Sequence, residues 1–152
     1  MLVKDAMQPG VVHVHPAVTL HEAAEKMLAH GVDTLFVMDD GRLLGVIGLR
    51  DLFTTPVSAS RGGRMSDWRS EQQLAEAWQR QTVENVMNEQ VLTVSDDLPL
   101  LRTASLMVNS GKHPLPVTRD GEIVGVIGRM DIVRALLAHA RPVAAGGDTA
   151  EP

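Results

Sequence analysis

The feature that most constrains this chain is an internal repeat with a spacing of 80 residues. Residues 3–53 align with residues 83–133 without a gap, and 17 of the 51 aligned positions are identical. A sequence that repeats in this way folds as successive copies of one supersecondary unit, which bury their apolar faces against each other. The identical pairs include Val3 and Val83, Met7 and Met87, Gly45 and Gly125, Ile47 and Ile127, Gly48 and Gly128, and Asp51 and Asp131.

Each copy predicts the order strand, helix, strand, strand, helix. In the first copy the run over 11–14 favours a strand, and apolar residues three and four apart over 20–28 predict a helix. Strands are expected at 35–38 and 43–47, because Asp40-Gly41 between them is a strong signal for a two-residue hairpin turn. The second copy carries the corresponding signals 80 residues further on.

The second helix of each repeat is expected to begin near Gly48 or Gly128. Because a three-stranded sheet cannot bury its apolar face alone, the two copies should pack sheet against sheet. The fold class is therefore α/β of the α+β kind, with two tandem β-α-β-β-α repeats packed as one pseudo-twofold module.

The repeat also sets the expected domain boundaries. Between the copies the chain begins as a loop and then predicts a helix, where Ser70 and Gln73 form a capping pair. After the second copy the composition turns to Gly, Ala and Pro, which is typical of disorder. The predicted segments are repeat 1 over 1–55, a linker with a helix over 56–82, repeat 2 over 83–140 and a disordered tail over 141–152.

Composition excludes several classes of function. The net charge is −5, which argues against a nucleic-acid partner, because binding the phosphate backbone needs a basic face. The chain has no cysteine, so disulfides, thiol catalysis and cysteine-ligated metals are absent. No apolar stretch has the length of a signal peptide or a membrane span, and we expect a cytoplasmic protein without a membrane partner.

Other constellations carry weaker signals. His13 and His15 share one face of a strand and, with His21 nearby, suggest a metal site. No acidic residue at ligand spacing accompanies them, so exposed histidines at a strand edge are the favoured interpretation.

Trp68 and Trp78 in the linker either cover an edge of the repeated core or meet a partner chain. No motif for a nucleophile elbow, a Walker loop or a dinucleotide site is present, and catalysis is not expected.

With these elements in order, the chain resembles a tandem pair of CBS domains, the family named after cystathionine β-synthase. The resemblance extends over about residues 3–137. It is carried by Val-x-x-x-Met before the first strand, the Leu-Pro-Val-like second strand, the Asp-Gly turn and the motif Gly-Val-Ile-Gly-x-x-Asp. In the two copies these are Val3 and Met7, 35–37, 40–41 and 45–51, and Val83 and Met87, 115–117, 120–121 and 125–131.

The resemblance implies a compact unit with two clefts that binds an adenosine derivative, such as AMP, ADP, ATP or S-adenosylmethionine, and regulates a partner protein. In the family the aspartate that opens the second helix binds the ribose hydroxyls, a role that falls here on Asp51 and Asp131. A carboxylate in the first turn of a helix is favoured by the helix dipole and can accept two hydroxyl hydrogen bonds. The alternative is that both aspartates only cap their helices. The other residues implied in ligand binding are Thr34, Ile47, Gly48, Lys112, His113, Pro114, Ile127, Gly128 and Arg129.

Gly48 and Gly128 depart from the family pattern, in which nucleotide-binding members usually carry a Ser or Thr whose hydroxyl contacts phosphate. Losing one such contact costs about 0.5–1.5 kcal/mol, up to roughly tenfold in affinity. Glycine allows close approach of the backbone, and the amides of a helix N-terminus still receive an anion. Phosphate binding is therefore weakened, not excluded.

The two clefts are also expected to differ. In the family each cleft combines the aspartate of one repeat with the residues before the second strand of the other. Asp51 would face residues 112–114, with Arg129 as a second positive charge, although solvation at a helix end explains positions 112 and 113 equally well. Asp131 would face residues 32–34, whose aspartate would repel phosphate. We therefore expect the better nucleotide site at Asp51, and at Asp131 either an empty cleft or a ligand without phosphate.

Two functions from different classes remain. The first is a regulatory module that senses an adenosine-type ligand, needs no obligatory cofactor and acts on a separate effector protein, since no effector domain is expected in the chain. The second is a dimerisation or scaffold module whose degenerate clefts bind no nucleotide. In either case we expect a homodimer through exposed apolar helix faces, especially around Leu136 and Leu137.

Overall fold

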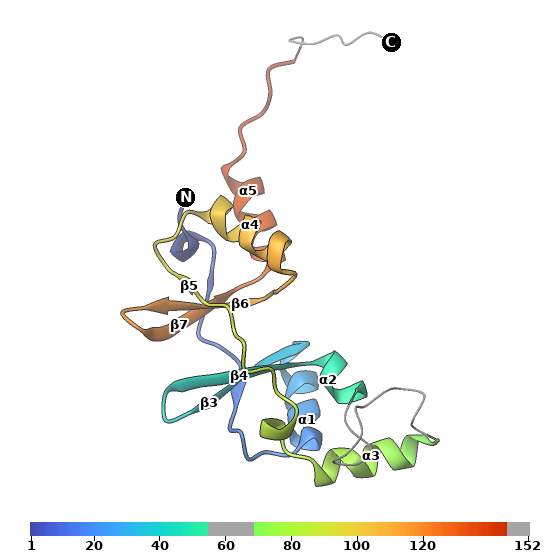
Figure 1. The fold of residues 1–152 in the computed structure, drawn as a ribbon. Helices are drawn as coiled ribbons and strands as arrows, with labels where there is room; N and C mark the ends of the chain where they lie inside the picture. The colour runs from blue at the N-terminus through green and yellow to red at the C-terminus, as the bar shows by residue number, and fades with distance from the viewer. Residues whose placement is uncertain (55–68, 146–152) are drawn as a thin grey trace.

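The computed structural model describes residues 1–54 and 69–145. The first repeat contains the five predicted elements, preceded by a short 3-10 helix and a two-residue strand, and the predicted linker helix follows it (Figure 1). In chain order these are η1 (Val3–Asp5), β1 (Gln8–Pro9), β2 (His13–Val14), α1 (Leu20–His30), β3 (Thr34–Asp39), β4 (Arg42–Gly48), α2 (Leu49–Phe53) and α3 (Glu71–Arg80).

The second repeat contains the same order of elements and ends in a longer helix. Its first strand, like β2, has only two residues, which is shorter than the four-residue run in the sequence. The elements are η3 (Val83–Asn85), β5 (Val94–Ser95), α4 (Leu100–Ser110), β6 (Leu115–Arg119), β7 (Glu122–Ile127) and α5 (Arg129–His139).

Local signals in the sequence explain where these elements begin and end. Thr19 caps α1 by accepting a hydrogen bond of 3.1 Å from the Glu22 amide. Ser70 caps α3 in the same way, with 3.1 Å from its hydroxyl to the Gln73 amide. The turn between β3 and β4 has positive φ at both Asp40 (51°) and Gly41 (74°), as a two-residue turn that matches strand twist requires. The cap at Ser70 and the turn at Asp40-Gly41 were predicted from the sequence and are confirmed.

The two sheets are completed by an exchange of segments between the repeats. One sheet has the order β2-β3-β4, and the other has the order β1-β7-β6-β5. Strand β1 comes from the start of the first repeat but pairs with β7 of the second, where Gln8 lies opposite Val126. In the reverse direction Asn88, which precedes β5, forms a bridge to Val46 on β4.

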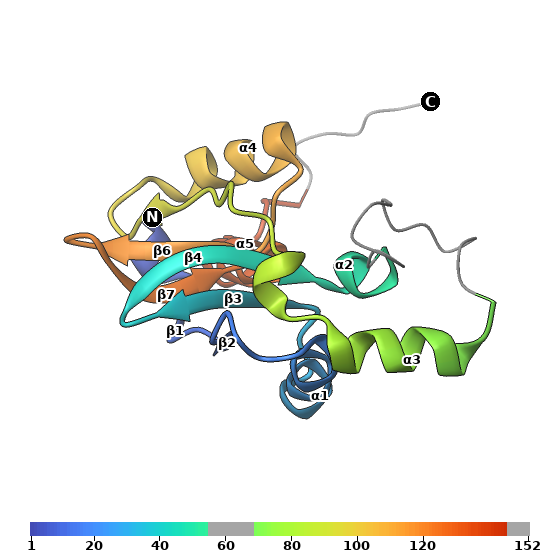
Figure 2. The same ribbon diagram turned by 60° about the horizontal axis from the view of Figure 1, so that its bottom comes forward.

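The hydrophobic cores show the same exchange. Val3 is fully buried in the core of the second repeat, and Val83 is fully buried in the core of the first. Met7 and Met87, which follow them, also pack against the core of the other repeat. Each repeat therefore needs the first residues of the other to close its core, so the two form one pseudo-twofold module, with the helices lying outside the sheets (Figures 1 and 2).

Outside the repeats, α3 lies against α1 of the first repeat (Figure 2). Residues 140–145 after α5 are irregular and exposed. The first part of the predicted linker with Trp68, and the last residues of the predicted tail, lie outside the described residues. Within the described ranges, no helix combines the length and apolar character that crossing a membrane requires.

Two glycines allow the exchanged segments to approach the sheets. A Cβ atom at Gly125 would lie 2.4 Å from the Gln8 carbonyl oxygen, and one at Gly45 would lie 2.9 Å from that of Asn88. Both distances are shorter than van der Waals contact, and both involve backbone atoms that cannot simply rotate away. The close approach of the exchanged segments thus explains the first glycine of the repeated Gly-Val-Ile-Gly motif.

We predict that Gly125→Ala and Gly45→Ala each lower the free energy of unfolding by about 1–3 kcal/mol, because the added methyl group displaces the crossing segment. Chemical denaturation followed by circular dichroism measures this. Gly48→Ala is the matched control, since its Cβ would lie 3.6 Å from the nearest atom, the Asp33 carbonyl oxygen, and its loss should be smaller. Equal stability of all three variants would contradict the close approach.

Candidate functional site

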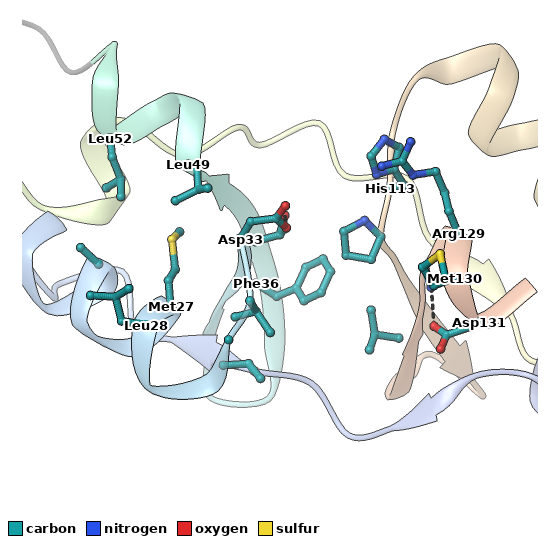
Figure 3. Close-up of a pocket in the computed structure, with 18 of the residues that line it drawn as sticks. Met27, Leu28, Asp33, Phe36, Leu49, Leu52, His113, Arg129, Met130 and Asp131 are labelled. Atoms are coloured by element: carbon teal, nitrogen blue, oxygen red, sulfur yellow. Dashed lines mark hydrogen bonds between the residues drawn. The ribbon is translucent and has the colours of Figure 1, made fainter. Parts of the chain in front are cut away.

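A pocket of about 920 Å³ lies between the two repeats and is lined by both (Figure 3). Its volume falls in the upper part of the range of roughly 300–1,000 Å³ that is usual for small-molecule sites. At one end it is polar and formed mainly by the second repeat. At the other end it is apolar and formed by the first repeat and the linker helix α3.

The polar end is built on the first turn of α5. Gly128, Arg129, Met130 and Asp131 line it, together with the segment 113–114 that precedes β6. Because β6 and β7 are antiparallel, with Leu115 opposite Ile127, the start of β6 and the end of β7 lie at one edge of the sheet. This pairing brings the segment before β6 next to the helix that follows β7.

The first repeat contributes residues 32–34 and Phe36 to the middle of the pocket. In Figure 3, Asp33 and Phe36 lie between the apolar end and the side chains of His113 and Arg129. The Asp33 carbonyl oxygen accepts a hydrogen bond of 3.1 Å from the Leu49 amide, which anchors this turn to the start of α2. Two carboxylates, Asp33 and Asp131, therefore face a pocket that also contains one guanidinium and one imidazole.

The apolar end is a trough between α1, α2 and α3. The indole N–H of Trp78 on α3 donates a hydrogen bond of 2.8 Å to the Leu52 carbonyl oxygen, and its ring packs against the core of the first repeat. Trp78 thus covers an edge of the repeated core, one of the two roles considered for it. The trough is lined by Met27, Leu28, Leu49, Leu52, Phe53 and Trp78.

The Asp131 carboxylate is held by three donors. Its Oδ2 accepts a hydrogen bond of 2.7 Å from the Gly128 amide. Its Oδ1 accepts two hydrogen bonds of 3.0 Å, one from the Gln8 side-chain amide and one from the Arg134 guanidinium. The side chain is only 12% exposed. Gln8 belongs to the exchanged strand β1, so the carboxylate at the pocket is tied to the N-terminal segment of the other repeat.

Asp51 occupies the equivalent position in the first repeat. Its Oδ2 accepts a hydrogen bond of 2.8 Å from the Gly48 amide, in the same way as Asp131 caps its helix in the second repeat. The residue that corresponds to Gln8 is Asn88, whose side-chain oxygen accepts a hydrogen bond of 2.9 Å from the Gln90 backbone amide. The two repeats therefore share the cap but differ in the residue that the crossing segment presents.

A scan against protein-family models matches the CBS domain twice, over residues 3–57 and 83–138. Together these matches cover more than half of the chain. The chain belongs to the CBS domain family. Both matched ranges follow the internal repeat, so the protein is a CBS pair.

Solved structures of CBS pairs have the same fold. CBSX2 of Arabidopsis thaliana, crystallised in complex with AMP, is 28% identical with a TM-score of 0.71, and the match covers 92% of this chain and 98% of CBSX2. The CBS domain pair of protein MJ0100, in complex with 5′-methylthioadenosine and S-adenosyl-L-methionine, is 25% identical with a TM-score of 0.68 and coverages of 92% and 98%. Both similar proteins bind adenosine-type ligands.

Curated relatives are less informative. An uncharacterised 17.7 kDa protein of Acidianus ambivalens is 29% identical over 126 residues, which is 82% of this chain and 66% of that protein. The chain spans less than two thirds of this relative and of the next, for which the share is 61%. Some matched relatives are enzymes, such as an L-aspartate semialdehyde sulfurtransferase of Methanocaldococcus jannaschii, of which this chain spans 23%.

The pocket of this CBS pair contains some of the residues that the family resemblance implied. Gly128, Asp131 and Arg129 line it, and so do Thr34 and the segment 113–114. Asp51, Gly48 and Lys112 are not among its lining residues. The Lys112 ammonium instead donates a hydrogen bond of 2.8 Å to the Gln90 carbonyl oxygen.

Ile47 and Ile127 were expected to contact the ligand, but their side chains are fully buried in the two cores. Along a strand, neighbouring side chains point to opposite faces of the sheet. Isoleucine therefore faces the core at these positions, and the preceding Val126 faces the pocket.

Residues that were expected in two separate clefts line this one pocket. Asp131 shares it with residues 32–34, and the segment 113–114 and Arg129, which were expected beside Asp51, line it as well. The physical reason is the antiparallel pairing of β6 and β7, which places that segment beside its own repeat's helix. Which carboxylate binds a ligand stays a prediction.

Gln8, Phe36 and Met130 were missed at the sequence level. The repeats differ at the position of Gln8, which is Asn88 in the second repeat. Only the exchange of strands shows that Gln8 contacts Asp131. The histidine cluster shows no metal-binding set: within the described ranges, no group of three or more His, Asp or Glu side chains gathers around one point. His15 instead pairs with Asp39 at 3.3 Å on the surface.

Proposed function

We propose that this CBS pair is a regulatory, non-catalytic module of the cytoplasm that binds an adenosine-type ligand at Asp131 and acts on a separate effector protein. The observation that carries the proposal is a nearly buried carboxylate in the first turn of α5, at the polar end of a pocket of sufficient size. A carboxylate in this position accepts hydrogen bonds from a pair of ribose hydroxyls, and charge-assisted bonds of this kind are the strong ones.

The surroundings of Asp131 suit the rest of such a ligand. Phe36, Pro114 and Val126 offer apolar surface to a purine ring. Arg129 supplies a positive charge for one phosphate, but Gly128 has no hydroxyl to add, and its amide already donates to Asp131. Since Asp33 also lies in the pocket, a ligand with little or no negative charge is favoured over a triphosphate.

The ligand test is a titration with AMP, ATP, adenosine, 5′-methylthioadenosine and S-adenosylmethionine, followed by calorimetry and thermal shift. We expect AMP, adenosine and the thioether compounds to bind more tightly than ATP and to raise the melting temperature, because a ligand of the folded state stabilises it. Asp131→Ala should weaken binding by about tenfold or more, since it removes hydrogen bonds to a charged group.

Asp51→Ala is the matched control, with the same change at the equivalent position of the other repeat. Loss of binding in Asp51→Ala with full binding in Asp131→Ala would place the site at the other aspartate. Absence of binding by every compound would favour the scaffold function, in which the clefts are degenerate.

A second test concerns Gln8, which occupies the Oδ1 atom of Asp131 that a ribose hydroxyl needs. We predict that Gln8→Ala tightens adenosine binding about three- to tenfold, because the hydroxyl no longer competes with the side-chain amide. Asn88→Ala, the same truncation in the other exchanged segment, should leave the dissociation constant unchanged. Weaker binding by Gln8→Ala in calorimetry would show instead that Gln8 supports the bound ligand.

We also propose a homodimer through the helices of the second repeat, as the sequence suggested. Large apolar side chains are exposed there: 82% of Val108, 73% of Leu137 and 45% of Leu136. Burying such a face in a symmetric contact removes apolar area from water and offsets the cost of association.

The dimer is tested by sedimentation velocity at micromolar concentration. The double variant Leu136→Glu with Leu137→Glu is expected to sediment as a monomer, with a dimer dissociation constant raised about a hundredfold or more. Val143→Glu is the control, since Val143 is 93% exposed in the irregular segment after α5 and should not affect the dimer. A monomeric parent protein would refute the proposal.

A further inference from the structure

The charged side chains at the polar end of the pocket nearly cancel each other. Asp33 and Asp131 bring two negative charges, and Arg129 brings one positive charge (Figure 3). The charge of Asp131 is already compensated, because the Arg134 guanidinium donates a hydrogen bond of 3.0 Å to its Oδ1. A ligand therefore meets the opposite charges of Asp33 and Arg129, and one further charge decides whether the pocket attracts an anion.

His113 is the side chain that can supply this further charge. Histidine ordinarily changes its charge between about pH 5 and 8, whereas Asp and Arg keep theirs over this range. The other histidines of the chain all lie in the described ranges, and none of them lines the pocket. In Figure 3 the His113 ring and the Arg129 side chain lie at the same end of the pocket. A protonated ring gives that end an excess of positive charge, and a neutral ring does not.

The two cationic groups are available to a ligand. In the part of the chain that the structure describes, neither the His113 ring nor the Arg129 guanidinium has a hydrogen-bond or ion-pair partner. The adjacent Lys112 ammonium, by contrast, is already bonded to a backbone carbonyl oxygen. An imidazole and a guanidinium without partners, at one end of a pocket, are donors that a single phosphate group can use.

The repeats differ at this position of the pocket. Asp33 and His113 are 80 residues apart, each precedes the second strand of its repeat, and both line the pocket. The Asp33 Oδ1 accepts a hydrogen bond of 3.2 Å from the Thr34 hydroxyl, which leaves the carboxylate charged. A phosphate in the pocket is therefore repelled by Asp33 throughout the range near neutral pH, and it is attracted by His113 only when the ring is protonated.

We propose that His113 makes the ligand preference of this CBS pair depend on pH. With a protonated ring the pocket accepts an adenosine derivative that carries one negative charge, and with a neutral ring it favours an uncharged one. An anionic ligand stabilises the protonated ring, so its affinity is highest at low pH and falls as the pH rises and the ring loses its proton. The inference rests on the proposed function, because it takes the nucleoside to lie at Asp131.

The test is calorimetry with adenosine and with the methyl phosphodiester of AMP. The diester keeps one negative charge throughout, whereas AMP changes its own charge at about pH 6, as phosphate monoesters do. We expect the affinity of the diester relative to adenosine to rise about three- to tenfold from about pH 8 to about pH 5.5, since a charge-assisted hydrogen bond at a partly exposed site contributes this much. Titrations in two buffers with different ionisation enthalpies should also show that the diester takes up protons on binding and adenosine does not.

His113→Gln keeps a side chain that donates a hydrogen bond but cannot gain a charge, and because His113 is exposed the variant should fold. It should abolish both the rise in relative affinity at low pH and the proton uptake. His30→Gln is the matched control, since His30 ends α1 and does not line the pocket, and it should retain both effects. Asp33→Asn should raise the relative affinity of the diester about threefold or more at every pH and keep its pH dependence, because it removes only the repulsion.

The outcomes separate this inference from the proposed function. If adenosine binds but the relative affinity of the diester does not rise at low pH, the inference is wrong and the proposed function stands. A rise that persists in His113→Gln, with a circular dichroism spectrum like that of the parent protein, assigns the proton to another group and also overturns the inference. If neither ligand binds at any pH, the proposed function itself fails, and this inference fails with it.

Discussion

The exchange of Val3 and Val83 between the two cores is the interaction on which the rest of the structure depends. Each of these valines is fully buried in the repeat to which it does not belong by sequence. A unit as small as one repeat buries only a modest fraction of its surface and is marginally stable alone, and a borrowed apolar segment adds to its core. Neither repeat is therefore complete without the other, and the space between them becomes a permanent feature of the fold.

The same exchange links the site to the chain's first residues. Strand β1 carries Gln8 to the Asp131 carboxylate, where it shares Oδ1 with Arg134. A ligand that takes this oxygen must displace or rearrange a residue of the crossing segment. Under the proposed function, a ligand bound at Asp131 would therefore be coupled to the contact between the repeats through Gln8.

The pocket also shows how a duplicated unit becomes a site with two different ends. The fold repeats faithfully, because the glycines, the turn and the core residues repeat. The lining residues diverge: Leu49 against Arg129, and Asp33 against His113. These side chains belong to neither core, so differences at these positions cost little stability, and they give the pocket one polar end and one apolar end.

The amino-acid sequence alone determined the two-repeat organisation, the hairpins at Asp-Gly, the helix caps at Thr19 and Ser70 and the family. These features depend on local backbone preferences and on periodic burial, which short stretches of sequence encode directly. Asp51 and Asp131 became candidates through the family resemblance, which the repeated Gly-Val-Ile-Gly-x-x-Asp motif carries.

Only the tertiary structure decided which residues share a pocket. The antiparallel register of β6 and β7 placed His113, Pro114 and Arg129 on the pocket of Asp131, and the family resemblance had led to the expectation that they face Asp51. Strand alternation buried Ile47 and Ile127, and the exchange of segments brought Gln8 across 123 positions of the chain to Asp131. Such contacts join residues far apart in sequence, so they follow from how the sheets pair and close, and no local pattern specifies them.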